Sequence, residues 1–313
     1  MASKHPVPRI DGSAVTSGFD VLVESGFVLY DEDQKIIAYQ DGELKFDFIL
    51  TKALLKKPTL STPQRQLAEE DQKNASPRVK SLRPGSDVDT NGYEIGDSGS
   101  DGHFLIANKF CFSRPHLMML TSDGHRRQHE PLDQSDLEAA WRRLNYLNDA
   151  TNDFVVFFNC GKDSGCSRLH KHLQLMPLPA TGFAIDFLNS SSKEEPQVPF
   201  EWFYHKFESG TVTPLCLVET YHRLLQQATA VWKDSVGHDL SDGHACPHNV
   251  VFTARWMVVI PRRRAAINKE AGVNSLGMLG IIAVATESEI DNWKRLGMAD
   301  SLKHLGVAKE MAR

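Results

Sequence analysis

The sequence predicts an α+β fold in which helices flank an antiparallel sheet. Two apolar, strand-like runs follow one another between residues 103 and 122, around a turn at Ser113–Pro115. A helical pattern then fills residues 132–149, and two more apolar runs, at 153–159 and 169–176, stand on either side of a turn-rich loop. This order of strand, strand, helix, strand, loop and strand favours an α+β domain on an antiparallel sheet.

The segments outside this region are more varied. Residues 44–48 alternate between apolar and polar, as in a half-buried strand. Residues 59–102 are polar and contain several Pro and Gly, which predicts a long mobile insertion. Later segments predict a helix at 214–235, a hairpin at 248–264 and closing helices at 287–306. Without internal repeats, we expect one domain over residues 1–313, in which residues 200–313 are a C-terminal elaboration.

Composition narrows the class of protein. The chain of 313 residues has a formal net charge of −5, so its overall charge does not attract nucleic acid or an anionic membrane. No apolar run has the roughly 20 residues that span a bilayer, and the first residues lack the apolar core of a secretory signal. Five cysteines without CxxC spacing do not form a disulfide framework. We expect a protein of the cytoplasm, with the nucleus as an alternative.

Three polar residues alternate in the run "LHKHLQLMP". In a strand, His170, His172 and Gln174 form a row on one face, while Leu169, Leu173 and Leu175 point mostly to the buried side. A neutral imidazole can attack phosphorus and form a phosphoramidate that a second acceptor cleaves. The amide of Gln174 can donate to a phosphate oxygen without adding charge.

The loop before this row has the composition of a phosphate cradle. It contains the small residues Gly161, Ser164, Gly165, Cys166 and Ser167. Glycine lets the backbone approach a ligand closely, so that successive N–H groups surround phosphate oxygens. Asn159, at the end of the preceding apolar run, can bond a ribose hydroxyl or a phosphate.

Two other interpretations of the histidine row are open. It can belong to a metal site with Cys160, Cys166 or His248, although no second spaced ligand pair is present and Gln is a poor zinc ligand. It can also be a solvated surface strand without function. The basic run Arg262–Arg264 is interpreted as a solvated face rather than a phosphate clamp.

The motif "HKHLQLMP", preceded by "FFNCGKDSGCSR", resembles the histidine-triad (HIT) superfamily, and within its HxHxQ transferase branch the fungal diadenosine tetraphosphate phosphorylases, also called ATP adenylyltransferases. Three further stretches resemble that branch: "LLKKP", "NKFCFSRPHLMMLT" and the C-terminal "HNVVFTARWMVVIPR" with "INKEAGVNSLGMLG". The resemblance covers the chain from about Leu44 to Gly280. It implies a HIT-like antiparallel sheet and a C-terminal part of the adenylyltransferase type.

The resemblance also implies a mechanism and a set of residues. His172 would attack the α-phosphorus of the dinucleotide, release ATP and hold AMP, which inorganic phosphate would take as ADP. Gln174 would stabilise the nucleotidyl-histidine, and His170 would orient the loop or the leaving group. The implied substrate-binding residues are Lys57, Asn108, Lys109, Asn159, Gly165, Cys166, Ser167, Arg168, Asn274, Ser275 and Leu276. Mg²⁺ is expected only as a companion of the polyphosphate, without a protein cage.

Three positions, two in the loop and one in the C-terminal part, depart from the family pattern. Its loop usually reads Gly-Ser-Ser-Gln, where this chain has "GCSR", and it usually has a lysine where this chain has Ala285. The alternatives are therefore hydrolysis of the dinucleotide, phosphorolysis of a nucleoside-diphosphate sugar, or a sensor that binds dinucleotides without turnover. The sequence does not predict an oligomeric state.

Overall fold

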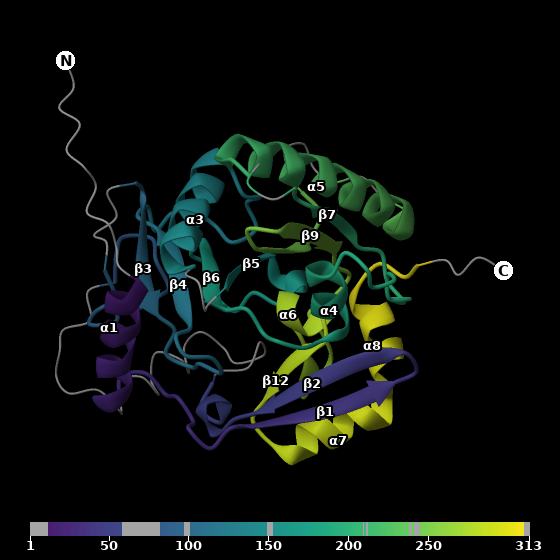
Figure 1. Ribbon diagram of the computed structural model, residues 1–313, viewed down its shortest axis with the longest axis horizontal. Coiled ribbons are helices and arrows are strands. Elements are labelled where there is room, and N and C mark those ends of the chain that lie inside the picture. The colour runs from purple at the N-terminus through teal and green to yellow at the C-terminus, as the bar shows by residue number, and fades with distance from the viewer. Residues whose placement is uncertain are drawn as a thin grey trace.

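A seven-stranded antiparallel sheet forms the centre of the molecule (Figure 1). The computed structural model describes residues 12–57, 82–96, 101–148, 153–208, 210, 212–237, 240 and 245–309. The strand order is β3-β4-β6-β5-β8-β9-β7. The strands are β3 (His103–Ala107), β4 (Leu117–Thr121), β5 (Phe154–Cys160), β6 (His172–Pro177), β7 (Phe203–Lys206), β8 (His248–Phe252) and β9 (Trp256–Pro261). The predicted α+β class and antiparallel sheet are confirmed.

Hydrophobic side chains cover both faces of this sheet. On one face, α1 (Gly12–Glu24), α3 (Gln134–Leu147) and α5 (Pro214–Val236) pack over one core. On the other face, a second core includes α4 (Phe183–Asn189) and the C-terminal elements. Because side chains alternate along a strand, Val156 of β5 enters the first core and Val155 enters the second. In the same way, Leu173 of β6 enters the first core and Met176 enters the second, so the strand that begins at His172 is buried from both sides.

A smaller, three-stranded sheet pairs an N-terminal hairpin with a C-terminal strand (Figure 1). It contains the hairpin β1 (Lys35–Asp41) and β2 (Leu44–Leu50), and β12 (Ile281–Val284) pairs in parallel with β2. The alternation predicted for residues 44–48 is confirmed, since Leu44, Phe46 and Phe48 are buried. The remaining elements are η1 (Lys52–Leu54), η2 (Lys162–Ser164), β10 (Ala266–Asn268), β11 (Ala271–Gly272), α6 (Ser275–Met278), α7 (Glu287–Leu296) and α8 (Met298–Leu305).

Helix α3 begins slightly earlier than its sequence signal suggests. Ser135 and Asp136 indicate the start, but the N-cap is Asp133, whose side chain accepts from the backbone N–H of Asp136. The Asp136 side chain in turn accepts from the N–H of Asp133, which completes a capping box. None of the described helices is long and apolar enough to cross a membrane.

Part of the predicted insertion packs against the large sheet. Residues 82–96 are described, and Val88 and Ile95 within them are buried. Backbone hydrogen bonds join Ile95 N to Leu105 O at 3.0 Å and Ala107 N to Tyr93 O at 2.8 Å. Residues 59–81 and 97–100 of the predicted insertion lie outside the described residues.

Candidate active site

His172 stands at the start of β6, in the interior of the large sheet. Its Nδ1 lies 2.8 Å from the carbonyl oxygen of His170, which can only accept, so Nδ1 carries the proton. Burial lowers the pKa of His172 to about 4, which keeps the ring neutral at neutral pH. The unprotonated Nε2 therefore has the lone pair that a nucleophile needs.

His170 uses both ring nitrogens within the protein. Its Nε2 donates to the carbonyl oxygen of Thr121 at 2.9 Å, so Nδ1 accepts from the Ser86 hydroxyl at 2.8 Å. The carboxylate of Asp87 accepts from the backbone N–H groups of Leu169 and His170, at 2.9 and 2.8 Å. His170 consequently acts on His172 through its carbonyl group, and its imidazole is held in place.

A buried carboxamide secures the two strands at the site. Gln128 accepts from His172 N at 2.7 Å, and its Nε2 donates to His172 O at 2.9 Å and to Asn159 O at 3.1 Å. Gln128 is 2% exposed, so these bonds do not compete with water. They fix the distance between the end of β5 and the start of β6. Sequence reasoning missed Gln128, Ser86 and Asp87.

Gln174 follows His172 on the same face of β6 and is half-buried. Its Oε1 lies 3.0 Å from Nε2 of His116 and 3.4 Å from Nδ2 of Asn108. The predicted row thus holds for His172 and Gln174, with Leu173 and Leu175 buried on the opposite side. Leu169 is 52% exposed, so the expectation that it points to the buried side is wrong, because β6 begins only at His172.

The loop between β5 and β6 has the backbone of a tight turn. Gly165 has φ +89°, and a Cβ there would lie 2.7 Å from the carbonyl oxygen of Val273, so only glycine fits. Cys166 and Arg168 are half-buried, while Ser167 and Lys57 are exposed. The loop therefore rests its backbone on the segment before α6 and presents its following residues toward solvent.

Two predicted cations lie within electrostatic range of the imidazoles. Besides burial, the charge of Arg168 lowers the pKa of His172. Burial and, to a lesser extent, the charge of Lys57 lower the pKa of His116 to about 4. Lys109 is half-buried, with its ammonium 5.6 Å from the ring centre of Phe110.

A buried polar network supports the loop from behind. Oδ1 of Asn159 accepts from the N–H and hydroxyl of Ser275, at 3.0 and 2.6 Å, and from Nδ2 of Asn249 at 2.9 Å. Asn249 also donates to Ser164 O at 2.8 Å. Arg262 donates to Oδ1 of Asn249 at 2.6 Å and to Val273 O at 3.2 Å. This network joins the predicted phosphate loop to the segment that precedes α6.

Arg262 corrects one interpretation of the sequence. Arg263 and Arg264 are exposed, but Arg262 is 0% exposed, so the solvated-face interpretation is wrong at that position. Its guanidinium donates to backbone carbonyls and to Asn249, and burial lowers its pKa to about 9. The remaining predicted residues near α6 are inward-facing: Asn274 caps the helix with its side chain, and Leu276 is buried in the core.

The metal interpretation finds no support in the ring nitrogens of His248. Nδ1 of His248 lies 2.7 Å from Cys246 O, and Nε2 lies 2.9 Å from the hydroxyl of Tyr221. Within the part of the chain that the structure describes, no three His, Cys, Asp or Glu side chains gather in a metal-binding arrangement.

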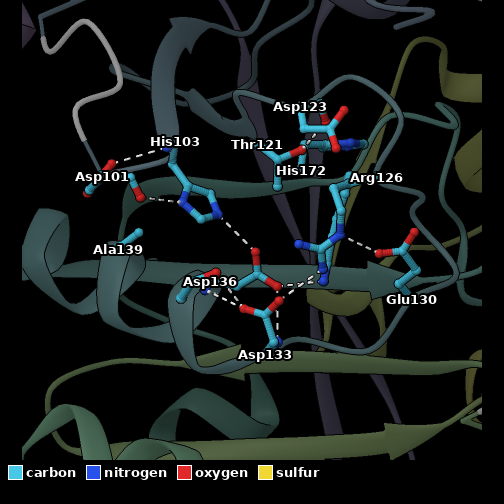
Figure 2. Close-up of polar contacts among 12 residues, drawn as sticks. Asp101, His103, Thr121, Asp123, Arg126, Glu130, Asp133, Asp136, Ala139 and His172 are labelled. Carbon is cyan, nitrogen blue, oxygen red and sulfur yellow. Dashed lines mark hydrogen bonds and ion pairs between the residues drawn. The ribbon is translucent and has the colours of Figure 1, made fainter. Parts of the chain in front are cut away.

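The residue between the two histidines of the motif forms a buried ion pair on the opposite side of the chain. Lys171 is 0% exposed, and its Nζ lies 2.5 Å from the carboxylate of Asp136 and 2.7 Å from Pro131 O. Figure 2 shows His103 pointing at the same carboxylate, which it contacts at 2.8 Å. Burial alone would raise the pKa of Asp136, but His103 and Lys171 outweigh it and hold that pKa below its ordinary value. Asp136 thereby ties α3 to the motif strand.

The chain is similar to known proteins over most of its length. Residues 40–187 match the family model of the Ap4A phosphorylase N-terminal domain, and residues 196–308 match that of the ATP adenylyltransferase C-terminal domain. Diadenosine 5',5'''-P1,P4-tetraphosphate phosphorylase 2 of Saccharomyces cerevisiae is 26% identical over 301 residues, which cover 87% of this chain and 91% of the yeast protein.

Solved structures show the same fold. The crystal structure of yeast Ap4A phosphorylase Apa2 superposes with a TM-score of 0.72 at 21% identity, over 98% of this chain and 97% of that one. The structure of the same yeast protein in complex with Ap4A gives a TM-score of 0.70 at 22% identity, over 97% and 100% of the two chains.

Proposed function

We propose that this chain, which belongs to the Ap4A phosphorylase family, phosphorolyses diadenosine 5',5'''-P1,P4-tetraphosphate to ADP and ATP through a covalent adenylyl-His172 intermediate. One observation carries the proposal. The hydrogen bond from Nδ1 of His172 to the carbonyl of His170 leaves Nε2 of a neutral, buried imidazole unprotonated. An imidazole held in this way is a nucleophile at neutral pH without help from a separate base.

The reaction divides into two displacements at the same phosphorus. In the first, the Nε2 lone pair of His172 attacks the α-phosphorus, the bond to the bridging oxygen breaks, and ATP leaves with that oxygen. In the second, an oxygen of inorganic phosphate attacks the same phosphorus, the N–P bond breaks, and ADP leaves. The hydrogen bond to the His170 carbonyl stabilises the positive charge on the imidazole while AMP is attached.

Groups around His172 support binding of a polyphosphate. The Gly165 turn, with Arg168 and Lys57 nearby, concentrates N–H groups and positive charge on the side of the imidazoles. Mg²⁺ as a companion of the substrate would neutralise part of its charge. The free cysteines Cys111, Cys160, Cys166, Cys216 and Cys246 support a reducing compartment, and we assign the reaction to the cytoplasm.

The acceptor decides between this proposal and its alternatives. The purified chain is incubated with diadenosine tetraphosphate and magnesium, with and without inorganic phosphate, and the nucleotides are separated. We expect ADP and ATP only in the presence of phosphate. AMP and ATP formed without phosphate would indicate a hydrolase, and binding without products would indicate a sensor. The same assay with a nucleoside-diphosphate sugar tests the remaining alternative.

A further inference from the structure

A buried histidine next to Gln174 is not used by the proposed reaction. His116, on the loop that leads into β4, is 1% exposed. Its ring packs against Phe112, with centroids 5.1 Å apart, and against Phe157, with centroids 6.0 Å apart. Its Nε2 meets Gln174, while its Nδ1 is buried and has no hydrogen-bond partner among the described residues. An unpaired polar atom in an aromatic pocket costs stability, so packing alone does not explain why a histidine stands at this position.

A chain of hydrogen bonds fixes the direction of each group in this cluster. It begins at the backbone N–H of Phe110, which must donate and lies 3.3 Å from Oδ1 of Asn108. Asn108 therefore turns Nδ2, a donor, toward Gln174, and the atom of Gln174 that it meets at 3.4 Å must be the acceptor Oε1. Nε2 of His116 lies 3.0 Å from the same oxygen and 3.2 Å from Nδ2 of Asn108. The shorter of these two contacts, to an oxygen that can only accept, favours a proton on Nε2.

This assignment also agrees with the orphan nitrogen. With the proton on Nε2, the unpaired Nδ1 is a lone pair rather than an N–H group. Buried N–H groups without an acceptor are the rarer defect in folded proteins. The other tautomer would bury an unpaired N–H between Phe112 and Phe157 and would turn a lone pair toward Oε1 of Gln174.

We propose that His116 is a positioning residue that fixes the carboxamide of Gln174, with its oxygen toward His116 and its NH₂ group toward the phosphoryl group in transfer. The inference deepens the proposed function and rests on it for its catalytic consequence. Within the described part of the chain, the Nε2 group of Gln174 has no hydrogen-bond partner, and the side chain is half-buried. If the carboxamide turned over, an oxygen lone pair would face the phosphoryl oxygens and repel them.

Nuclear magnetic resonance of the wild-type chain tests the geometry without requiring turnover. The two nitrogens of a neutral imidazole have well-separated ¹⁵N chemical shifts, so histidine-labelled protein reports the tautomer of His116, assigned by loss of its signals in His116→Phe. We expect the proton on Nε2, and a Gln174 side-chain amide signal that moves in His116→Phe. A proton on Nδ1 would overturn the proposal, and so would an unmoved Gln174 amide.

Kinetics of matched variants test the consequence. His116→Phe keeps a ring but cannot donate, whereas His116→Gln offers an amide N–H near the place of Nε2. We expect His116→Phe to lower kcat roughly tenfold to a hundredfold, with KM changed less than about threefold, and His116→Gln to restore most of the loss. The thermal midpoint of His116→Phe should not fall, because the unpaired Nδ1 is removed.

A double variant separates positioning from a general structural effect. If His116 acts through Gln174, His116→Phe combined with Gln174→Ala should have the same kcat as Gln174→Ala alone. Multiplying losses would overturn the proposal, as would wild-type kcat in His116→Phe. A wild-type chain that does not turn over diadenosine tetraphosphate contradicts the proposed function, while the tautomer and the Gln174 amide still decide the geometry of His116.

Discussion

Where the chain enters β6, polar side chains are buried on both of its sides, but the two sides are built differently. The side with His172 and Gln174 contains neutral groups joined by hydrogen bonds to carbonyls and amides. On the other side, Lys171, the residue just before β6, pairs with the carboxylate of Asp136. His103 contacts the same carboxylate (Figure 2). Lys171 and His172, which are adjacent in the chain, therefore enter an ionic and a neutral environment.

The difference follows from what each side must do. A buried ion pair is rigid when its remaining hydrogen bonds are satisfied, and Asp136 also accepts from His103 and from the backbone of Asp133. The ion pair can hold the chain in place, but the lone pairs of its carboxylate are used in these contacts and are not available to a substrate. The neutral imidazole of His172 keeps a lone pair on Nε2, while the ion pair of Lys171 and the hydrogen bonds of Gln128 hold its backbone in place.

Removing the nucleophile should have the largest effect, and only on chemistry. We expect His172→Ala to lower turnover of diadenosine tetraphosphate at least about a thousandfold, because the unprotonated Nε2 that would attack the phosphorus is removed. The cost in stability should stay below about 2 kcal/mol, since one hydrogen bond and one ring are lost. Nucleotide binding by calorimetry should persist. Turnover within tenfold of the wild type would refute the role of His172.

Removing the buried cation should have the converse effect. Lys171→Met keeps the length of the side chain but leaves the carboxylate of Asp136 without its cation. We expect the free energy of unfolding in urea to fall by about 3 kcal/mol, with kcat of the folded fraction within about tenfold of the wild type. The control is Lys193→Met, whose exposed pair with Asp186 spans 3.1 Å and should cost less than about 1 kcal/mol. Equal losses in the two variants would contradict the contrast between the sides.

Acid should weaken the neutral side before the ionic one. His116 and His172 have pKa values of about 4 in the folded protein, below the ordinary 6.5, because burial disfavours the charged ring. Between pH 6.5 and 4 the unfolded chain therefore binds more protons, and stability falls as pH falls. Each such histidine contributes up to about 1.4 kcal/mol per pH unit.

The pKa of Asp136 is lowered below its ordinary 3.8, so its contribution to stability is lost only at still lower pH. Unfolding in urea between pH 7 and 4 measures the first window. His172→Asn retains a donor for the His170 carbonyl but cannot titrate, so its stability should depend less steeply on pH. An unchanged slope in that variant would show that His172 does not titrate in this range.

The sequence predicted what local pattern determines. Alternation along β2 and the row of His172 and Gln174 follow from the period of a strand, and the structure confirms both. Arg262 could not be separated from its exposed neighbours, because its inward side chain depends on hydrogen bonds to residues distant in the sequence, among them Leu305. Likewise, Ser86 lies 84 residues before the ring that it contacts, in a segment whose composition resembles a mobile loop.

Ser86 offers the smallest test of the comparison. Its hydroxyl donates to Nδ1 of His170 at 2.8 Å, so Ser86→Ala leaves one buried lone pair unpaired while Nε2 still donates to Thr121 O. We expect a loss of about 1 kcal/mol in urea unfolding and a fall in kcat of less than about tenfold. Because His170 orients His172 through its carbonyl rather than its ring, the nucleophile keeps its tautomer. A loss of activity as large as that of His172→Ala would mean that the His170 ring takes part in the chemistry. A loss of stability as large as that of Lys171→Met would mean that neutral hydrogen bonds hold the chain as firmly as the ion pair does.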